Sequence, residues 1–187
     1  PDLTNVVVVL LPRMSNFTDF NALSAEKDVA LRFAASRDDL SGADVVILPG
    51  SKNTLEDLGY LVTAGFPAAL QLHMERGGEL VGICGGYQML GQEISDPKGL
   101  EGGGISKGLS FLDVMTELDA PKICRQVHAT SLLHGVEQLG PVRGYEIHLG
   151  RTSRGAVNAC FHIEAPETLE SYTKGDEGAA SENGLVW

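Results

Sequence analysis

The sequence predicts an α/β domain with a mostly parallel sheet, helices on both faces of that sheet, and some antiparallel strands in the C-terminal half. Three observations support this prediction: short runs of apolar β-branched residues, apolar residues at helical spacing between those runs, and Gly or Pro at their borders. Strands that alternate with helices form parallel sheets, because each crossover helix returns the chain to the same edge. The 187 residues suffice for one such domain, which would bury roughly two thirds of the surface of the unfolded chain.

Four strands are expected in the N-terminal half. Residues 6–11 are an uninterrupted apolar run that Pro12 ends, which is typical of a central strand covered on both faces. Apolar residues alternate with small or polar ones at 29–33, and this pattern indicates a shorter, partly exposed strand. Residues 43–48 and 79–83 are predicted to be two more buried strands.

Two helices are expected between the last two of these strands. Apolar residues recur at helical spacing over residues 53–76, and Gly and Pro interrupt the spacing at residues 65–67. The Gly-rich segment at residues 95–108 predicts a flexible insertion. Shorter strand-like segments of antiparallel character follow at residues 111–115, 126–132, 145–149 and 157–163.

Charge, hydropathy and cysteine content exclude several classes of protein. The net charge of −11 opposes tight binding of nucleic acid or anionic lipid. The apolar run at residues 6–11 is far shorter than the ~20 residues that span a bilayer, and no signal-peptide pattern precedes it. Three widely spaced cysteines do not resemble a disulfide framework, so reduced thiols are expected. We therefore expect a cytoplasmic protein with neither nucleic acid nor a membrane as a partner.

The segment Gly82-Ile83-Cys84-Gly85-Gly86 has the form Gly-x-nucleophile-x-Gly, directly after a predicted strand and before a helical pattern. A sharp strand-to-helix turn strains the nucleophile, and flanking residues without a Cβ atom allow neighbouring backbones to approach. The amides of Gly85 and Gly86 would then lie at the positive end of a helix, where they lower the pKa of the thiol and can bind an oxyanion. Alternatively, Cys84 is a small buried hydrophobic residue.

Other candidate patterns do not predict a cofactor site. Cys124, His128 and His134 match no zinc signature and have no fourth ligand nearby, so no metal site is expected. Lys52 and Lys107 lack the glycine pattern of a phosphate-binding loop, so ATP is not expected to bind.

Four segments in matching order resemble a known family: residues 11–20, 48–54, 82–91 and 144–152. They are similar to the glutamine amidotransferase domain of cobyric acid synthase, a class I, triad-type amidotransferase, and the resemblance implies a flavodoxin-like fold. The glutaminase subunit of lipid II isoglutaminyl synthase has similar motifs and is the alternative within the same class. The Ser-Asn-Phe-Thr-Asp-Phe sequence at residues 15–20 favours the cobyric acid branch.

The resemblance implies that Cys84 attacks glutamine and forms a thioester. The released ammonia passes to an ATP-using synthetase domain of the same polypeptide, which amidates corrin carboxylates in cobalamin biosynthesis. ATP and Mg are expected on that domain, and no cofactor is expected on this one. Gly50 and Gly85 would supply oxyanion-hole amides and Gln88 would lie near the substrate; alternatively, Gly50 only makes a tight turn and Gln88 solvates a helix face.

Further residues are weaker candidates for substrate contact. Ser51 adjoins Gly50 in its motif, and Tyr145, Glu146 and His148 lie in the fourth motif. For these last three, a structural role is favoured, and His148 in particular is expected to hold a turn through a hydrogen bond. An interpretation from a different functional class is a non-catalytic docking or corrinoid-sensing domain, which has the fold of the family without its activity.

The catalytic histidine of the resembling family lies in a segment that follows a turn and a strand. Residues 183–187 match this turn and strand, so the histidine is expected a few residues beyond Trp187. Residues 1–187 are accordingly expected to be a single domain, cut at its C-terminal end from a larger synthetase and slow to hydrolyse glutamine. His162 and Glu164 mimic a His-x-Glu pair but come one segment too early, so His162 is expected to be a half-exposed strand residue.

Overall fold

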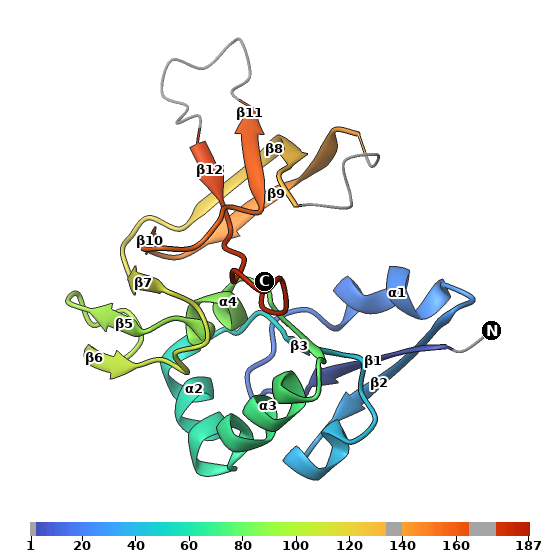
Figure 1. Cartoon of the computed structure of the whole chain (residues 1–187). Helices are drawn as coiled ribbons and strands as arrows, with labels where there is room; N and C mark the ends of the chain where they lie inside the picture. The colour runs from blue at the N-terminus through green and yellow to red at the C-terminus, as the bar shows by residue number, and fades with distance from the viewer. Residues whose placement is uncertain (1–2, 134–139, 165–174) are drawn as a thin grey trace.

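Four parallel strands form the first sheet, here named the parallel sheet. The computed structural model of the chain describes residues 3–133, 140–164 and 175–187 (Figure 1). Every predicted strand of the N-terminal half is present, and the side chains of residues 6–9 are buried on both faces as expected. The strands follow the order β2-β1-β3-β4 and are β1 (Thr4–Val9), β2 (Val29–Ala34), β3 (Val45–Leu48) and β4 (Glu79–Gly82).

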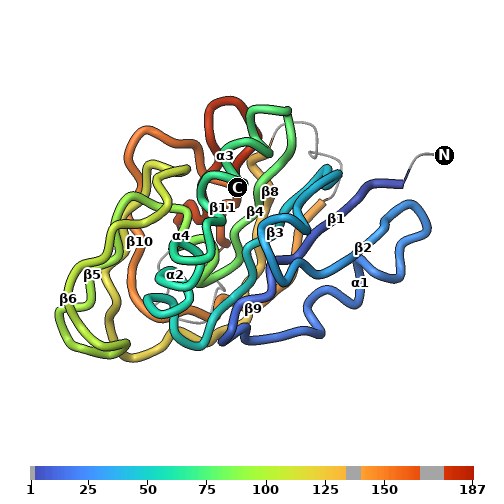
Figure 2. Tube along the Cα trace, turned by 90° about the horizontal axis from the view of Figure 1, so that it is seen from below, coloured from blue at the N-terminus to red at the C-terminus, as the bar shows by residue number. Residues whose placement is uncertain are grey.

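Helices cover both faces of the parallel sheet, as predicted. The helical elements are η1 (Phe17–Phe20), α1 (Asn21–Ala25), η2 (Arg37–Leu40), α2 (Thr54–Thr63), α3 (Phe66–Glu75) and α4 (Gly85–Leu90). Figure 1 shows α1 above the sheet and α2 and α3 below it, and Figure 2 views these two helices from below. Gly65, with a left-handed φ of 76°, separates α2 from α3 at the predicted break. Within the described ranges, none of the helices has both the length and the apolar character needed to cross a membrane.

The second sheet, here named the mixed sheet, corrects one prediction. Its strands follow the order β10-β7-β5-β6 and are β5 (Glu93–Asp96), β6 (Gly104–Lys107), β7 (Val114–Glu117) and β10 (Arg151–Arg154). The predicted flexible insertion at residues 95–108 is therefore wrong, because β5 and β6 pair as an antiparallel hairpin across it. Glycines at positive φ make the turns of this hairpin, so the Gly-rich composition has a conformational origin.

The third sheet, here named the antiparallel sheet, confirms the predicted change of character in the C-terminal half. Its strands follow the order β12-β11-β8-β9 and are β8 (Ile123–Ser131), β9 (Val142–His148), β11 (Phe161–Glu164) and β12 (Gly175–Glu177). A small cluster of Val127, Ala129 and Ile163 forms its own core, separate from the main core of the parallel sheet. Figure 1 shows this sheet standing above α4.

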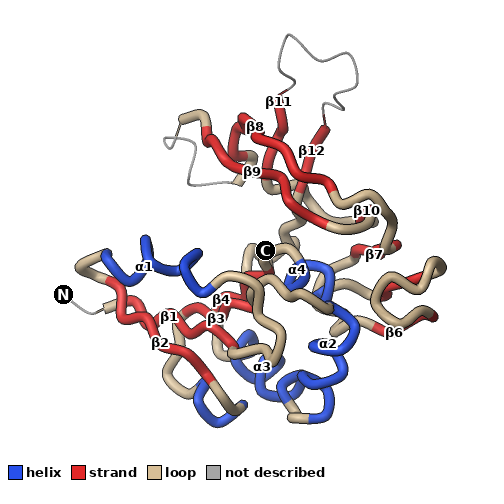
Figure 3. Tube along the Cα trace, turned by 180° about the vertical axis from the view of Figure 1, so that it is seen from behind, coloured by secondary structure: helices blue, strands red, loops and turns tan. Residues whose placement is uncertain are grey.

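The last three residues extend the parallel sheet at the edge of β4. Leu80 donates its N–H to the carbonyl of Leu185 at 2.7 Å, and Trp187 donates to the carbonyl of Leu80 at 2.9 Å. The amide of Gly82 donates to the carbonyl of Trp187 at 2.8 Å, and the pairing is parallel. Figure 3 shows the C-terminus beside β4 and α4. The predicted final strand is therefore present, and it runs toward the same edge of the sheet as β4.

Helix α4 packs directly against the ends of β3 and β4. A Cβ atom at Gly86 would lie 2.0 Å from the carbonyl oxygen of Leu48, and a Cβ atom at Gly82 would lie 2.6 Å from the Cα of Tyr87. These distances are far below van der Waals contact, and the atoms met are mostly backbone, which cannot move aside. Only glycine therefore allows this approach, as the motif around Cys84 predicts.

We expect Gly86→Ala to destabilise the fold by about 3 kcal/mol, because the new methyl group overlaps the backbone of β3. Gly59→Ala is the matched control, since Gly59 lies within α2 and its Cβ atom would meet nothing within 4 Å. That control should stabilise the helix by about 0.5–1 kcal/mol. Urea unfolding monitored by circular dichroism measures both variants, and equal stability of Gly86→Ala and wild type would contradict the packing argument.

Candidate active site

Three loops meet at the carboxyl edge of the parallel sheet, where ligands bind in open α/β folds. Cys84 follows β4 and Gly50 follows β3, while the loop after β1 carries Ser15. Ser15 donates its N–H to the carbonyl of Gly50 at 2.9 Å, and Lys52 donates to the carbonyl of Arg13 at 2.9 Å. These two bonds form a short antiparallel ladder, so the segments 11–20 and 48–54 lie side by side next to the cysteine.

Cys84 occupies a strained backbone conformation at the start of α4. Its φ is 53° and its ψ is −111°, a combination that a residue with a Cβ atom rarely adopts. Such a conformation costs on the order of 1–3 kcal/mol and persists only where surrounding packing imposes it. The turn places the cysteine side chain outside the helix and the sheet, and the residue is exposed.

The antiparallel sheet closes over one side of this cysteine. The Cys84 thiol donates a weak hydrogen bond to the carbonyl of Ile147 in β9, with 3.4 Å between sulfur and oxygen. A Cβ atom at Gly50 would lie 3.7 Å from the Cβ of Cys84, on the side of the parallel sheet. The thiol therefore lies between a loop of the parallel sheet and an edge strand of the antiparallel sheet.

The electrostatic surroundings of the Cys84 thiol do not lower its pKa. Partial burial of the sulfur raises the pKa, and the N–H of Gly85 opposes this shift only in part. Lys122 also favours the thiolate, whereas the charges of Glu101 and Asp19 disfavour it. The predicted lowering contribution of an amide at the helix terminus is present at Gly85, but desolvation outweighs it and the net pKa of the thiol is raised.

The loop after β3 lies against Cys84 and the first turn of α4. A Cβ atom at Gly85 would lie 3.1 Å from the amide nitrogen of Ser51, so the loop after β3 touches the first turn of α4. The N–H groups of Gly50 and Ser51 donate no hydrogen bond to another residue in the described ranges. This arrangement provides unengaged amide donors beside a thiol, which can bind an oxyanion.

The side chain of Ser51 has a structural partner. Its hydroxyl donates to the carboxylate of Asp57 at 2.6 Å and accepts from the N–H of Asn53 at 3.0 Å. Asp57 is fully buried and also accepts from the N–H of Arg13 at 3.2 Å. Burial raises the pKa of Asp57, and the bond from Ser51 opposes that shift. Asp57 thus joins both loops, a role that its position in the first helical turn of α2 did not signal.

Gln88 connects α4 to the loop after β9. It is 5% exposed, so the alternative that it solvates a helix face is wrong. Its Nε2 donates to the carbonyl of Leu149 at 2.9 Å, and its N–H donates to the carbonyl of Cys84 at 3.1 Å. The side-chain oxygen of Gln88 accepts no hydrogen bond from a described residue. Gln88 lies one helical turn beyond Cys84.

Glu146 and His148 have structural contacts. The ring of His148 lies 2.9 Å from both the carbonyl oxygen of Gly150 and the carboxylate of Glu146, so it holds the turn after β9 as predicted. Burial alone would raise the pKa of Glu146, but hydrogen bonds from Arg125 and His148 lower it below its ordinary value. Tyr145 points to solvent and is 70% exposed.

No histidine of the described ranges forms a hydrogen bond with the Cys84 thiol. His162 lies in β11, is half-exposed as predicted, and has its Nδ1 2.7 Å from the carboxylate of Asp176 in β12. Glu164 accepts from the hydroxyl of Thr130 and does not orient His162. The His-x-Glu pattern therefore belongs to the antiparallel sheet, away from the cysteine.

The described residues contain no group of three or more His, Cys, Asp or Glu side chains arranged to hold a metal ion. Of the pattern Cys124, His128 and His134, the last residue lies outside the described ranges.

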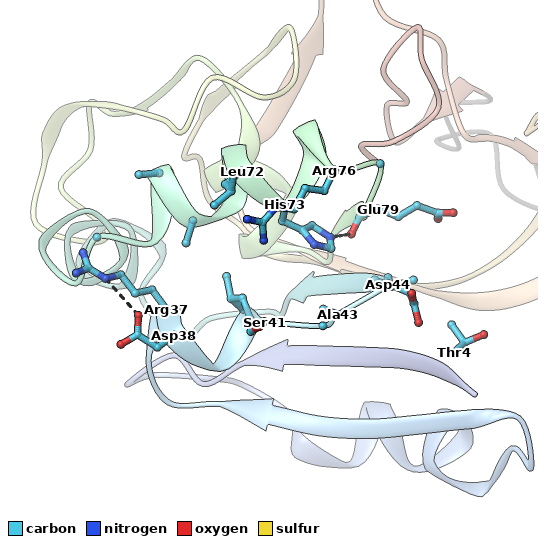
Figure 4. A pocket seen from close by; sticks show the side chains of 18 residues that line it. Thr4, Arg37, Asp38, Ser41, Ala43, Asp44, Leu72, His73, Arg76 and Glu79 are labelled. Atoms are coloured by element: carbon cyan, nitrogen blue, oxygen red, sulfur yellow. Dashed lines mark hydrogen bonds and ion pairs between the residues drawn. The ribbon is translucent and has the colours of Figure 1, made fainter. Parts of the chain in front are cut away.

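A surface cavity of about 810 Å³ lies at the opposite edge of the parallel sheet (Figure 4). Thr4, Val45 and Glu79 line it, and these residues begin β1, β3 and β4. The cavity is therefore at the amino ends of the strands, whereas Cys84 is at the carboxyl ends. Its size does not make it the candidate active site, because it contains none of the residues of the four motifs.

Comparison with known proteins agrees with this geometry. The model of a family described as the CobB/CobQ-like glutamine amidotransferase domain matches residues 5–187. The cobyric acid synthase of Vibrio campbellii is 42% identical over 183 residues, which are 97% of this chain and 36% of that protein. The cobyric acid synthase of Rhizobium etli is 48% identical over 183 residues, 97% of this chain and 35% of that protein. The chain thus spans about a third of the length of these relatives.

Solved structures share the fold. PurLQS from Thermotoga maritima has a TM-score of 0.72 at 18% identity, over 98% of this chain and 84% of that chain. A glutamine amidotransferase from the same organism has a TM-score of 0.64 at 12% identity, over 100% of this chain and 74% of that chain. These structures confirm the predicted flavodoxin-like α/β class. Because the family model and the curated relatives match nearly the whole length, the chain belongs to the CobB/CobQ-like glutamine amidotransferase domain family.

Proposed function

We propose that this domain is the glutaminase of a cobyric acid synthase, with Cys84 as the nucleophile. The observation that carries the proposal is the strained turn at Cys84, which presents a thiol beside the amides of Gly50, Ser51 and Gly85. Backbone strain of this kind is concentrated at functional sites, and several hydrolases expose a nucleophile on a sharp strand-to-helix turn.

In the proposed reaction, the sulfur of Cys84 attacks the carboxamide carbon of glutamine. The carbonyl oxygen becomes an oxyanion, which the amides of Gly50 and Gly85 stabilise, with Ser51 adjoining them. The carbon–nitrogen bond then breaks, the leaving nitrogen takes a proton, and ammonia departs while a thioester forms. Water hydrolyses the thioester, which releases glutamate and restores the thiol. The side-chain oxygen of Gln88 is available to orient the substrate from α4.

The proton that the leaving ammonia needs is proposed to come from a histidine beyond Trp187. The strand at residues 185–187 runs parallel to β4, and Cys84 follows the end of β4 by two residues. A chain that continues past Trp187 in the same direction would therefore emerge beside the thiol. The raised pKa of Cys84 supports this proposal, since such a thiol needs a base to become a nucleophile.

Ammonia released here is proposed to pass to a synthetase domain of the same polypeptide, where ATP and Mg would support amidation of corrin carboxylates. Support comes from the names of the relatives and from their length, of which this chain covers about a third. A glutaminase of peptidoglycan synthesis is not favoured, because the matched relatives are cobyric acid synthases. A purely passive docking domain would have no need for a strained cysteine.

A glutamine-like electrophile, such as a diazoketone analogue of glutamine, should label Cys84 and no other residue. Cys84→Ala should abolish labelling and lower glutamine hydrolysis by at least about 10³-fold. Cys124→Ala is the matched control, because Cys124 is also an exposed cysteine but lies in β8, and it should label like wild type. Intact-mass spectrometry measures the labelling, and an unreactive Cys84 in the full-length protein would favour a passive domain instead.

Alkylation of Cys84 by iodoacetamide should depend on pH in a predictable direction. The pKa of this thiol is raised by burial, so the thiolate fraction at neutral pH is smaller than in a free thiol. In Cys124→Ala protein of residues 1–187, the midpoint of the rate against pH should therefore lie above that of a cysteine in an unfolded peptide with blocked ends. A midpoint below that of the peptide would show that the local amides already activate the thiol.

Extension of the chain by about twenty natural residues beyond Trp187 should raise the rate of glutamine hydrolysis by about 10²–10⁴-fold, the usual contribution of a general acid–base group. Replacement of the first histidine of that extension by alanine should remove the gain and leave the melting temperature unchanged. An extended protein that hydrolyses glutamine no faster than residues 1–187 would refute the location of the proton donor.

A further inference from the structure

Glu101, in the loop between β5 and β6, caps a helix that is distant in sequence. Its carboxylate accepts a hydrogen bond from the N–H of Leu55 at 3.1 Å and also interacts with the N–H of Thr54. These are the first two residues of α2, whose N–H groups have no partner within the helix. Asn53 caps the next amide, that of Glu56, at 2.9 Å. The start of α2 thus depends on a carboxylate 46 residues away.

A buried carboxylate shapes the loop that carries Glu101. Asp96, at the end of β5, is 1% exposed and accepts from the N–H groups of Leu100, Glu101 and Gly103 at 2.8–2.9 Å. Burial would raise the pKa of Asp96, but these bonds lower it below the ordinary value, so the carboxylate is ionised and holds the loop at neutral pH. Asp96 therefore fixes the backbone position from which the Glu101 side chain reaches α2.

The capped end of α2 touches the candidate active site. The hydroxyl oxygen of Thr54 lies 3.1 Å from the point where a Cβ atom of Gly85 would be, and the amide nitrogen of Ser51 lies at the same distance from that point. Thr54 is 3% exposed, so little space remains for the start of the helix to shift. A displacement of Thr54 would therefore move the loop that carries Gly50 and Ser51, or the first turn of α4.

We propose that Glu101 is a positioning residue of the glutaminase site, which fixes the amides of Gly50 and Ser51 relative to Cys84 by capping α2. This inference rests on the proposed glutaminase function and assigns to that site a residue outside its four motifs. Glu101 acts through Thr54 and Leu55, and its carboxylate is already engaged by their N–H groups. It is therefore a support for the oxyanion-binding loop and not a contact of the substrate.

The test compares Glu101→Ala and Glu101→Gln in the full-length protein, with glutamine hydrolysis as the readout. Alanine removes the cap, so kcat should fall by about tenfold or more while KM for glutamine changes by less than about threefold. Glutamine keeps an acceptor oxygen for the helix amides, so most of kcat should return. Melting temperatures are recorded for each variant, since loss of a cap costs about 1 kcal/mol.

Asp39→Ala is the matched control. The Asp39 carboxylate also accepts from backbone N–H groups, those of Ala35 and Ser36, but it caps η2 away from Cys84. The Asp39→Ala substitution should lower the melting temperature about as much as Glu101→Ala and leave kcat unchanged. Iodoacetamide should still label Cys84 in all variants, because the turn at the cysteine is intact. Labelling should be no slower in the two Glu101 variants, because the charge of Glu101 disfavours the thiolate.

Three outcomes overturn the inference. Equal kcat values for Glu101→Ala and Asp39→Ala would reduce Glu101 to a stability role. An increase in KM without a change in kcat for Glu101→Gln would make it a substrate contact. A kcat for Glu101→Gln as low as that of Glu101→Ala would mean that the cap is not what matters. If wild type does not hydrolyse glutamine and Cys84 does not react with the glutamine analogue, the proposed function itself fails, which is a separate result.

Discussion

The contact between α4 and the ends of β3 and β4 is the constraint on which the rest of the site depends. Gly86 lies against the carbonyl of Leu48, and Gly82 lies against the backbone of Tyr87, so the helix begins closer to the sheet than any side chain would permit. The connection between strand and helix is then too short for ordinary dihedral angles, and Cys84 adopts a strained backbone conformation with positive φ. The outward position of Cys84 is thus a consequence of backbone packing, and the hydrogen bond from its sulfur to Ile147 is not needed to produce it.

Buried carboxylates organise the loops around this turn. Asp57 joins the loops after β1 and β3 through Arg13 and Ser51, and Asp96 holds the loop after β5 through its amides. The two differ in electrostatics: burial raises the pKa of Asp57, whereas several N–H donors lower the pKa of Asp96. A carboxylate can accept several hydrogen bonds at once, so one buried side chain can fix the geometry of a whole loop. In the proposed mechanism, the amides that would bind the oxyanion are consequently held by side chains that do not touch the substrate.

The sequence predicted what depends on local patterns and missed what depends on long-range contacts. The four parallel strands, the break at Gly65 and the turn at Cys84 all follow from nearby apolar, Gly or Pro residues. Residues 95–108 were misjudged because Gly composition alone does not distinguish a flexible segment from a hairpin with glycines at positive φ. The bond between Asp57 and Arg13 spans 44 residues and the bond between Glu101 and Leu55 spans 46, and no spacing rule connects either pair. The pKa of Cys84 was misjudged because sequence shows the helix terminus and not the desolvation.

Presentation and activation of the nucleophile are therefore separate problems in this domain. Presentation is local, since the strand, the two glycines and the helix all lie within a dozen residues of Cys84. Activation has to overcome the burial that raises the pKa of the thiol. The N–H of Gly85 at the helix terminus lowers this pKa by less than burial raises it. In the proposed mechanism a group from another segment must provide the remainder, and the strand at residues 185–187 leads the chain toward the thiol. In that mechanism, the burial that raises the pKa of the thiol lowers its thiolate fraction, which also slows its reaction with adventitious electrophiles.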